Sequence, residues 1–313
     1  MKFCLITHIA DPDGAMPIIL SRLVFDKIDV FSCEIDEVDN ILKQVISGDY
    51  DRIYIVDLNV SEEMAQLIND DNDLKNKIII YDHHQSKESL NRYPFIHVVV
   101  ENNGRKECGT TLYYQHLKEL TNNPILNKEV IIKMIELVRQ NDTFDFTDEL
   151  KDEALMFRNL YDIYGRERYI DHFYQFILQN EYFEFTGIEK ELIEIEEERT
   201  KRYIEEKMKH VKKAKINGIP VGIVFAESNR SRLGHEMTSK IDDIDIAVVI
   251  NVDRSVSYRA DKENVDTTIL SIYYGGGGHK HASGSPLPND LQEKIVEYIF
   301  KNVIWEETWK LEK

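Results

Sequence analysis

The sequence predicts an α/β protein: an N-terminal domain with a mainly parallel sheet, a helical linker, and a smaller C-terminal α/β domain. Three observations carry this prediction. Short β-branched or aromatic runs alternate with helical patterns in the first third of the chain, residues 188–217 contain neither Gly nor Pro, and a second alternation follows. The 313 residues are 42% hydrophobic and 31% charged, which is the composition of a globular protein with room for two domains.

The first domain is expected over residues 1–186. Its predicted strands are residues 3–7, 29–33, 53–56, 78–81 and 96–100. Continuous apolar runs separated by helical segments are typical of parallel strands that are buried on both faces, so we expect a layered sheet. The pattern then becomes helical from residue 127 to residue 178.

The linker is expected over residues 187–217. Acidic residues crowd its beginning and basic residues its end, as the helix dipole favours, and Gly187 and Gly218 bracket it. We therefore predict one long helix joining the domains. Nucleic-acid binding by its Lys and Arg residues is the less favoured alternative, because mixed charge runs are usually solvated faces.

The second domain is expected over residues 218–313. Its predicted strands are residues 221–226, 244–252 and 256–259. Helices are expected near residues 233–241, near residues 267–273 and from residue 290 onward.

The charge balance restricts the partners of the chain. It carries 39 Lys and Arg against 57 Asp and Glu, a formal charge of -18, which repels long polyanions such as duplex nucleic acid. A small anionic substrate remains compatible, because divalent cations invert the local field of an acidic site. The first apolar run is broken at Asp11 and Asp13, and no run reaches the roughly 20 apolar residues of a membrane span, so we expect a cytoplasmic protein without membrane contact.

Ionisable residues follow three of the predicted strands. Residues 3–7 run into His8, Asp11 and Asp13; residues 53–56 run into Asp57; residues 78–81 run into Asp82, His83 and His84. Because the carboxyl ends of parallel strands meet at one edge of a sheet, these side chains are expected to converge. Asp142, which follows a helical segment, is a further candidate carboxylate.

Carboxylates with imidazoles form an oxygen and nitrogen ligand set that suits Mn²⁺ or Mg²⁺. Two ions about 3.5–4 Å apart could share Asp57 and clamp a phosphoryl group. Simpler interpretations exist, since Asp11 begins a good turn and Asp57 could cap a helix near Ser61. An acidic residue beside two histidines after a buried strand has no such packing rationale, and this favours the metal site.

A glycine run in the second domain is the other candidate site. Gly275, Gly276, Gly277 and Gly278 can adopt positive φ and let backbone N–H groups approach a phosphate, and His279 adds a donor. Arg259 ends a predicted strand and could clamp a phosphate by its fork. The structural alternatives are a flexible turn for the glycines and a surface ion pair for the arginine.

These motifs resemble a known family. The order HxxDxDG from His8, strand-end Asp57, Asp82-His83-His84 and later Asp142 resembles the DHH phosphoesterase superfamily. Arg259 followed by GGGGHKHASG resembles its DHHA1 substrate domain.

The resemblance implies roles for these residues. Ligands implied for a first Mn²⁺ are His8, Asp11 and Asp57. Those implied for a second are Asp13, Asp57, His83 and Asp142. His84 would face the substrate and Asp82 would orient a histidine. The interval from His8 to Asp11 is three residues where relatives commonly show two or four, so the pairing of these two residues on one metal stays open.

The resemblance also implies an activity. The DTF sequence from Asp142 and the HxxDxDG opening look most like the oligoribonuclease, or nanoRNase, branch. We therefore expect manganese-dependent, exonuclease-type hydrolysis of short single-stranded oligonucleotides to nucleoside monophosphates. The alternatives are a cyclic or linear dinucleotide phosphodiesterase, a 3′,5′-bisphosphate nucleotide phosphatase and, in another class, a non-catalytic nucleotide- or RNA-binding module. The sequence leaves open whether RNA or DNA is preferred and which end is attacked. It also leaves open whether Mg²⁺ replaces Mn²⁺ and whether the chain forms a homodimer.

Overall fold

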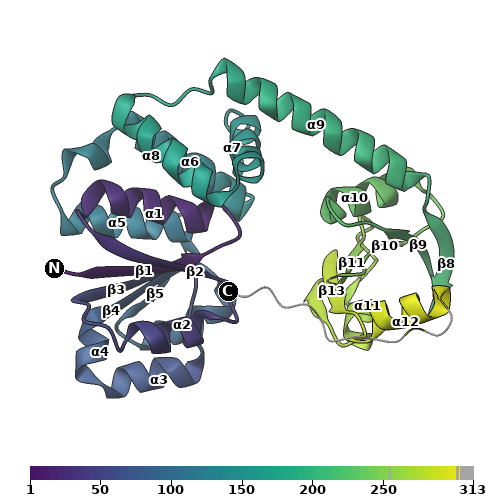
Figure 1. The fold of residues 1–313 in the computed structure, drawn as a ribbon, viewed down its shortest axis with the longest axis horizontal. Helices are drawn as coiled ribbons and strands as arrows, with labels where there is room; N and C mark the ends of the chain where they lie inside the picture. The colour runs from purple at the N-terminus through teal and green to yellow at the C-terminus, as the bar shows by residue number, and fades with distance from the viewer. Residues whose placement is uncertain (254, 301–302, 304–313) are drawn as a thin grey trace. The chain divides into compact units, whose positions relative to one another are not determined.

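The computed structural model of the chain describes residues 1–253, 255–300 and 303. It divides into two compact units, Met1–Glu194 and Ile195–Lys313, each described by itself below (Figure 1). No helix within these described residues is long and apolar enough to cross a membrane.

The first unit is built on a five-stranded parallel sheet in the order β2-β1-β3-β4-β5. Its strands are β1 (Phe3–His8), β2 (Ile28–Cys33), β3 (Arg52–Val56), β4 (Ile78–Asp82) and β5 (Ile96–Val98). All five coincide closely with the predicted runs, which confirms the parallel sheet.

Both faces of this sheet are covered by helices (Figure 1). On one side lie α1 (Pro12–Val24), α5 (Gly109–Leu120), α6 (Glu129–Thr143), α7 (Lys151–Tyr164) and α8 (Arg166–Gln179). On the other lie α2 (Val38–Val45), α3 (Glu62–Asp70) and α4 (Asn72–Lys77). The connections include two 3₁₀ helices, Gln85–Arg92 and Pro124–Asn127, and the short hairpin of β6 (Glu101–Asn102) and β7 (Arg105–Lys106).

The largely apolar character of β1, β3 and β4 follows from this double cover. Along β1, Leu5 packs into the core that contains α1 and α5, whereas Cys4 and Ile6 pack into the core on the opposite face. Because successive side chains of a strand point to opposite faces, a strand covered on both sides needs apolar residues at every position.

The predicted linker helix is shorter than expected. The helix α9 runs from Gly187 to Met208, and the division between the two units falls within it. Its predicted continuation to residue 217 is wrong, because β8 (Lys212–Ile216) pairs antiparallel with β9 (Ile219–Phe225). The turn between them is Asn217-Gly218, with φ of 51° and 83°. An Asn-Gly pair with positive φ at both residues favours a tight hairpin, and this local preference overrides the charge pattern.

The second unit holds a six-stranded mixed sheet in the order β12-β13-β11-β10-β9-β8. Its remaining strands are β10 (Ile246–Asn251), β11 (Ser255–Arg259), β12 (Gly277–His279) and β13 (Ala282–Pro286), and its helices are α10 (Arg230–Lys240), α11 (Thr268–Tyr273) and α12 (Leu291–Ile299). Strands β9 and β10 are parallel, and the other neighbours are antiparallel. The sequence analysis gave no bounds for β8, β12 or β13.

An ion-pair network around the buried Arg139 supplies a pH-dependent part of the stability of the first unit. Arg139, 3% exposed, donates from Nη2 to Oε1 of Glu136 at 2.7 Å, and Arg105 donates from Nη2 to Oε2 of the same carboxylate at 2.7 Å. Burial raises the pKa of Glu136, but the hydrogen bonds from Arg139, Gln140 and Arg105 outweigh it and lower the pKa from 4.5 to about 2.

We expect Glu136→Gln to lower the free energy of unfolding at pH 7 by about 2 kcal/mol, because the buried Arg139 would lose the Glu136 carboxylate and keep Asp145 as a charged partner. Because the pKa of Glu136 is lower in the folded state, its carboxylate stabilises the fold fully above the unfolded-state pKa of 4.5. This stabilisation is lost as the pH falls from 4.5 toward about 2. We therefore expect the difference in free energy of unfolding between variant and wild type, measured in urea, to be smaller at pH 3 than at pH 7. The control is Glu153→Gln, which removes the more exposed pair with Lys133; an equal loss in both variants would contradict the prediction.

Candidate metal centre

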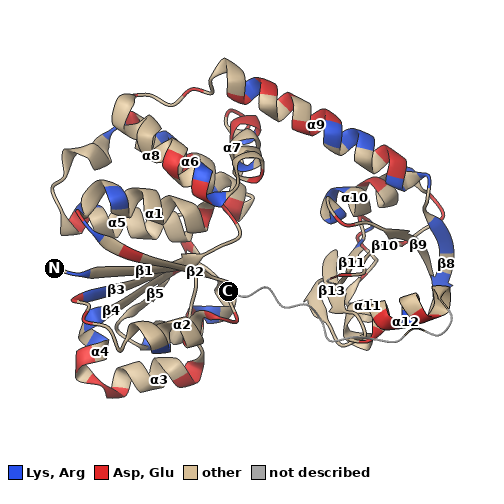
Figure 2. Cartoon of the chain, in the orientation of Figure 1, with Lys and Arg blue, Asp and Glu red and all other residues tan. Residues whose placement is uncertain are grey.

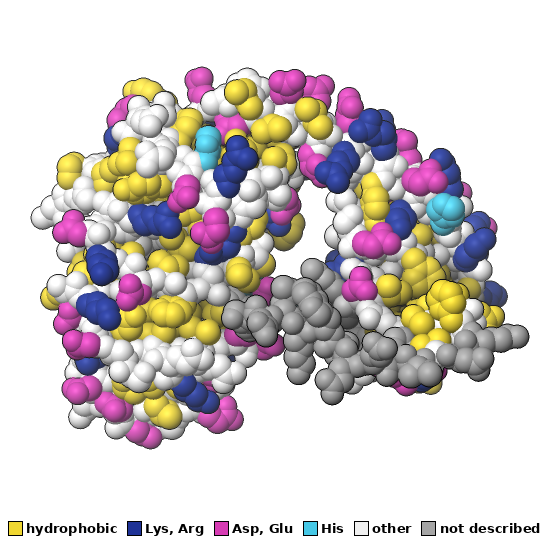
Figure 3. All heavy atoms as spheres, viewed as in Figure 1, with side chains coloured by type: hydrophobic (Ala, Val, Ile, Leu, Met, Phe, Trp, Pro, Cys, Tyr) yellow, Lys and Arg dark blue, Asp and Glu magenta, His cyan; other side chains and the backbone are white. Residues whose placement is uncertain are grey.

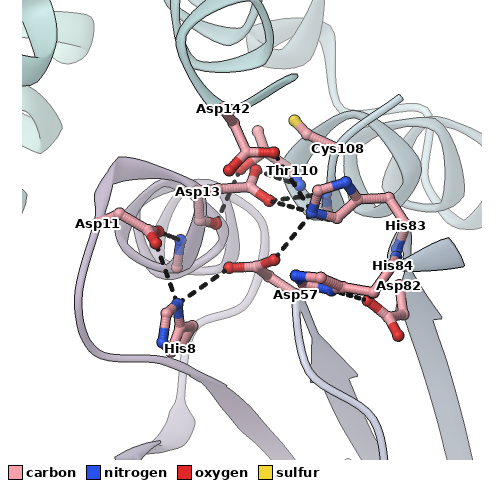
Figure 4. A network of polar contacts seen from close by, with 12 residues as sticks. His8, Asp11, Asp13, Asp57, Asp82, His83, His84, Cys108, Thr110 and Asp142 are labelled. Carbon is pink, nitrogen blue, oxygen red and sulfur yellow. Dashed lines mark hydrogen bonds and ion pairs between the residues drawn. The ribbon is translucent and has the colours of Figure 1, made fainter. Parts of the chain in front are cut away.

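The ionisable residues converge at the carboxyl edge of the parallel sheet, as predicted (Figure 4). His8 is the last residue of β1, Asp57 directly follows β3, and Asp82 ends β4. The start of α1 adds Asp11 and Asp13, the residues after β4 add His83 and His84, and the end of α6 adds Asp142.

Asp57 occupies the middle of the cluster. Its side chain is 2% exposed, and its two carboxylate oxygens face different histidines, with Oδ1 3.2 Å from Nε2 of His83 and Oδ2 3.5 Å from Nδ1 of His8. Its backbone lies in the left-handed region with φ of 61°, held by a hydrogen bond from its N–H to the carbonyl of Tyr81. Such a conformation costs energy for a residue with a Cβ and is found preferentially at functional sites. The alternative helix-cap role is excluded, since Ser61 caps α3.

One group of candidate ligands forms around His8. Its Nδ1 lies 3.0 Å from Oδ2 of Asp11, while Oδ1 of Asp11 accepts the N–H of Gly14 and caps α1. Asp11 is therefore both a helix cap and a neighbour of His8, and the two interpretations from sequence are compatible. The ligand atoms of His8, Asp11 and Asp57 all lie within 4.8 Å of one another.

The second group forms around Asp13, which is 1% exposed. Its carboxylate accepts the N–H groups of Gly109 at 2.7 Å and Thr110 at 2.8 Å, both at the start of α5. The Thr110 hydroxyl also donates to the Asp13 carbonyl at 3.0 Å. Neither Gly109 nor Thr110 is among the candidates of the sequence analysis, and the two residues orient Asp13 from 96 and 97 positions further along the chain.

Asp142 completes this second group. Its Oδ2 lies 3.3 Å from Nε2 of His83, and that nitrogen is 3.9 Å from Oδ2 of Asp13. The ligand atoms of the three residues lie within 4.8 Å of one another. Within the described part of the chain, Asp142 Oδ2 is buried without a hydrogen bond of good geometry, which fits an oxygen that ligates a cation.

Electrostatics support the same interpretation. Burial, and then the charges of neighbouring carboxylates, raise the pKa of both Asp13 and Asp142. Hydrogen bonds to Asp11 and Asp57 raise the pKa of His8 to about 11. Burial and the repulsion of neighbouring carboxylates therefore disfavour the charged forms of Asp13 and Asp142, a cost that divalent cations would relieve. The oxygen and nitrogen donors of the cluster suit Mn²⁺ or Mg²⁺.

Asp82 lies beneath the cluster and orients its neighbours. It is 0% exposed, accepts the backbone N–H of His83 at 2.8 Å, and lies 2.7 Å from Nδ1 of His84. Its other oxygen accepts from Nδ2 of Asn59 at 2.9 Å, and Asn59 in turn accepts the N–H of Val60. The sequence analysis missed Asn59, a polar residue two positions after Asp57. The half-exposed His84 ring is thus held by a buried chain of hydrogen bonds.

The second unit places Arg259 and His279 in one row of its sheet, because each is paired with Ala282 of β13. Arg259 is partly buried, and its Nη1 donates to the carbonyl of Tyr258 at 2.9 Å. No carboxylate among the described residues forms an ion pair with it, so the surface ion pair is excluded there.

The glycine run divides into two kinds of position. A Cβ on Gly276 would lie 2.0 Å from the carbonyl oxygen of Gly284, and one on Gly278 would lie 2.6 Å from Cα of Ser283. These two glycines are required by close packing on β13. Gly275 and Gly277 have nothing within 4 Å of a Cβ and are open to a ligand. The alternative of a flexible turn for all four glycines is wrong, because Gly277 and Gly278 belong to the strand β12.

The first unit is an α/β domain whose parallel sheet carries, at its carboxyl edge, carboxylates and imidazoles that could hold metal ions. Residues 2–138 match the model of the DHH family, N-terminal domain. The first unit of this chain is thus similar to the DHH family over residues 2–138, which confirms the resemblance of its N-terminal motifs.

Individual relatives extend the comparison. The chain is 28% identical over 257 residues to oligoribonuclease NrnB of Bacillus subtilis (strain 168), covering 82% of this chain and 64% of that protein. The chain thus spans less than two thirds of that relative. Among solved structures, a pGpG-specific phosphodiesterase, PggH from Vibrio cholerae, has a TM-score of 0.52 at 15% identity, covering 95% of this chain and 97% of the other. The DHH domain of a protein from a family of ribosomal proteins has a TM-score of 0.58 at 14% identity, covering 95% and 85%. Both share the fold.

Proposed function

We propose that the chain is a divalent-metal-dependent phosphodiesterase that hydrolyses short oligonucleotides to nucleoside monophosphates, with Mn²⁺ as the expected ion. The observation that carries the proposal is the pair of ligand groups that meet at Asp57. The match to the DHH family and the similarity to an oligoribonuclease support it.

In this proposal His8, Asp11 and Asp57 hold one ion. The second ion takes the ligands Asp13, Asp57, His83 and Asp142. Two bound divalent ions would neutralise phosphoryl oxygens and lower the pKa of a water that attacks phosphorus. The two N–H groups at the start of α5 keep Asp13 in place for this task.

His84 is proposed to act on the substrate. Its hydrogen bond with Asp82 is the main cause that raises its pKa, so the ring holds a proton more readily than a free imidazole does. A protonated imidazole at the edge of the cluster can donate to a phosphate oxygen or to the leaving oxygen. Arg259, Gly275, Gly277 and His279 of the second unit are proposed to bind a phosphate group, with Gly276 and Gly278 shaping that segment.

A short substrate agrees with the surface charge. On the face seen in Figure 3, basic and acidic side chains are interspersed within each unit, and the formal charge is -18. A long polyanion would need a continuous basic track to offset this repulsion. A linear dinucleotide is the second candidate substrate, because the structurally similar PggH is a pGpG-specific phosphodiesterase.

The test is product analysis of the purified chain with Mn²⁺, with Mg²⁺ and with EDTA. Substrates are RNA and DNA of about two to five nucleotides, pGpG, a cyclic dinucleotide and adenosine 3′,5′-bisphosphate. We expect EDTA-sensitive release of mononucleotides from the short RNAs. Cleavage of pGpG alone would select the dinucleotide candidate, and tight nucleotide binding without turnover in either metal would replace the proposal with a binding module.

A further inference from the structure

A groove lies at the opposite edge of the parallel sheet from the metal-ligand cluster. Residues at the starts of β3 and β4, on α4 and on β5 line it, among them Arg52, Lys75, Ile79, Pro94, Phe95 and His97. Its volume is about 470 Å³. Sites of roughly 300–1,000 Å³ accommodate small organic ligands.

The charge of this groove differs from that of the chain. No Asp or Glu of the described residues lines it, although acidic residues outnumber basic ones by 57 to 39 in the sequence. Arg52 donates from Nη1 to the carbonyl of Asn76, and Lys75 donates from Nζ to the carbonyl of Asn69 at 3.2 Å. Neither cation forms an ion pair with a carboxylate of the described chain. Figure 2 shows basic segments at the start of β3 and on α4. Two adjacent cations without a carboxylate partner attract a small anion.

Aromatic and apolar side chains also line the groove, and Tyr81 and His116, which do not line it, pack in a row with His97. His97 is exposed and stacks on Tyr81, with ring centroids 5.3 Å apart and an interplanar angle of 21°. The His116 ring packs against the same tyrosine at 5.2 Å, and its Nε2 is buried without a hydrogen-bond partner among the described residues. Phe95 also lines the groove, but it is 3% exposed and belongs to the core, so His97 presents the more exposed ring. Flat rings beside apolar surface favour the stacking of a planar ligand.

We propose that this groove is a second ligand site, separate from the metal-ligand cluster, for a small phosphate-bearing molecule with a flat ring, of the nucleoside monophosphate class. Arg52 and Lys75 hold the phosphate, and His97 stacks on the ring. This inference is independent of the proposed function, because binding here requires no metal and no turnover.

The probe is labelled AMP, and its binding is measured by equilibrium dialysis of the full chain in EDTA. An Arg259→Ala background removes the candidate phosphate contact of the second unit. Lys75→Glu is expected to weaken AMP binding at least about tenfold, because an attractive charge becomes repulsive. His97→Ala should weaken it about fivefold through lost stacking. Lys43→Glu, the same charge change at an exposed residue of α2, should leave the Kd within about twofold.

Two outcomes would overturn the proposal. One is that AMP does not bind to the Arg259→Ala background, or that Lys75→Glu and Lys43→Glu give the same Kd for AMP. The other is displacement of AMP by inorganic phosphate at equal concentration, because a site that stacks the ring must prefer AMP to phosphate alone. Neither outcome bears on oligonucleotide cleavage, which is measured with metal present.

Discussion

Asp57→Asn is expected to lower kcat/KM for short RNA by at least about three orders of magnitude. The neutral amide cannot serve two cations at once, and the substitution removes the carboxylate that faces both His8 and His83. Kinetics in Mn²⁺ and the metal content of the purified variant measure the effect. The control is Asp49→Asn, an exposed aspartate of the same unit, which should keep wild-type activity.

Folding must be checked alongside, since Asp57 is buried. Unfolding in urea should show that the variant is folded at the assay temperature. A folded Asp57→Asn variant with wild-type turnover would rule out the two-ion arrangement around this carboxylate.

Gly109→Ala is expected to lower kcat/KM about 100-fold or more and the free energy of unfolding by about 3 kcal/mol. A Cβ there would lie 2.6 Å from Cβ of Asp57 and 2.8 Å from its Cα. Both neighbours are part of the chain backbone or attached to it, so the start of α5 must shift. That shift would displace the N–H groups that orient Asp13.

The matched control is Gly187→Ala, because a Cβ at that helical position meets nothing within 4 Å. It should retain activity and change stability by less than about 1 kcal/mol. Equal behaviour of the two alanine variants would show that α5 adjusts to the extra methyl group and does not need close contact with Asp57.

The strands of the first unit and most of the candidate ligands could be predicted because their signals are local. A strand buried on both faces is apolar at every position, and an ionisable residue directly after such a strand has one place to go, the carboxyl edge. His8, Asp57 and His83 were found in this way. The helix predicted to residue 217 failed because the turn signal of Asn217-Gly218 outweighs a charge pattern that suits a helix.

What the sequence by itself determined is the parallel sheet, the two-unit order and the identity of the residues that gather at one edge. Only the tertiary structure decided how those residues are held. Gly109 and Thr110 bind Asp13, and Asn59 binds Asp82, through contacts between segments up to 97 residues apart. The physical reason is that hydrophobic periodicity records which face of an element is buried, whereas a hydrogen bond across the fold depends on where packing brings two backbones together.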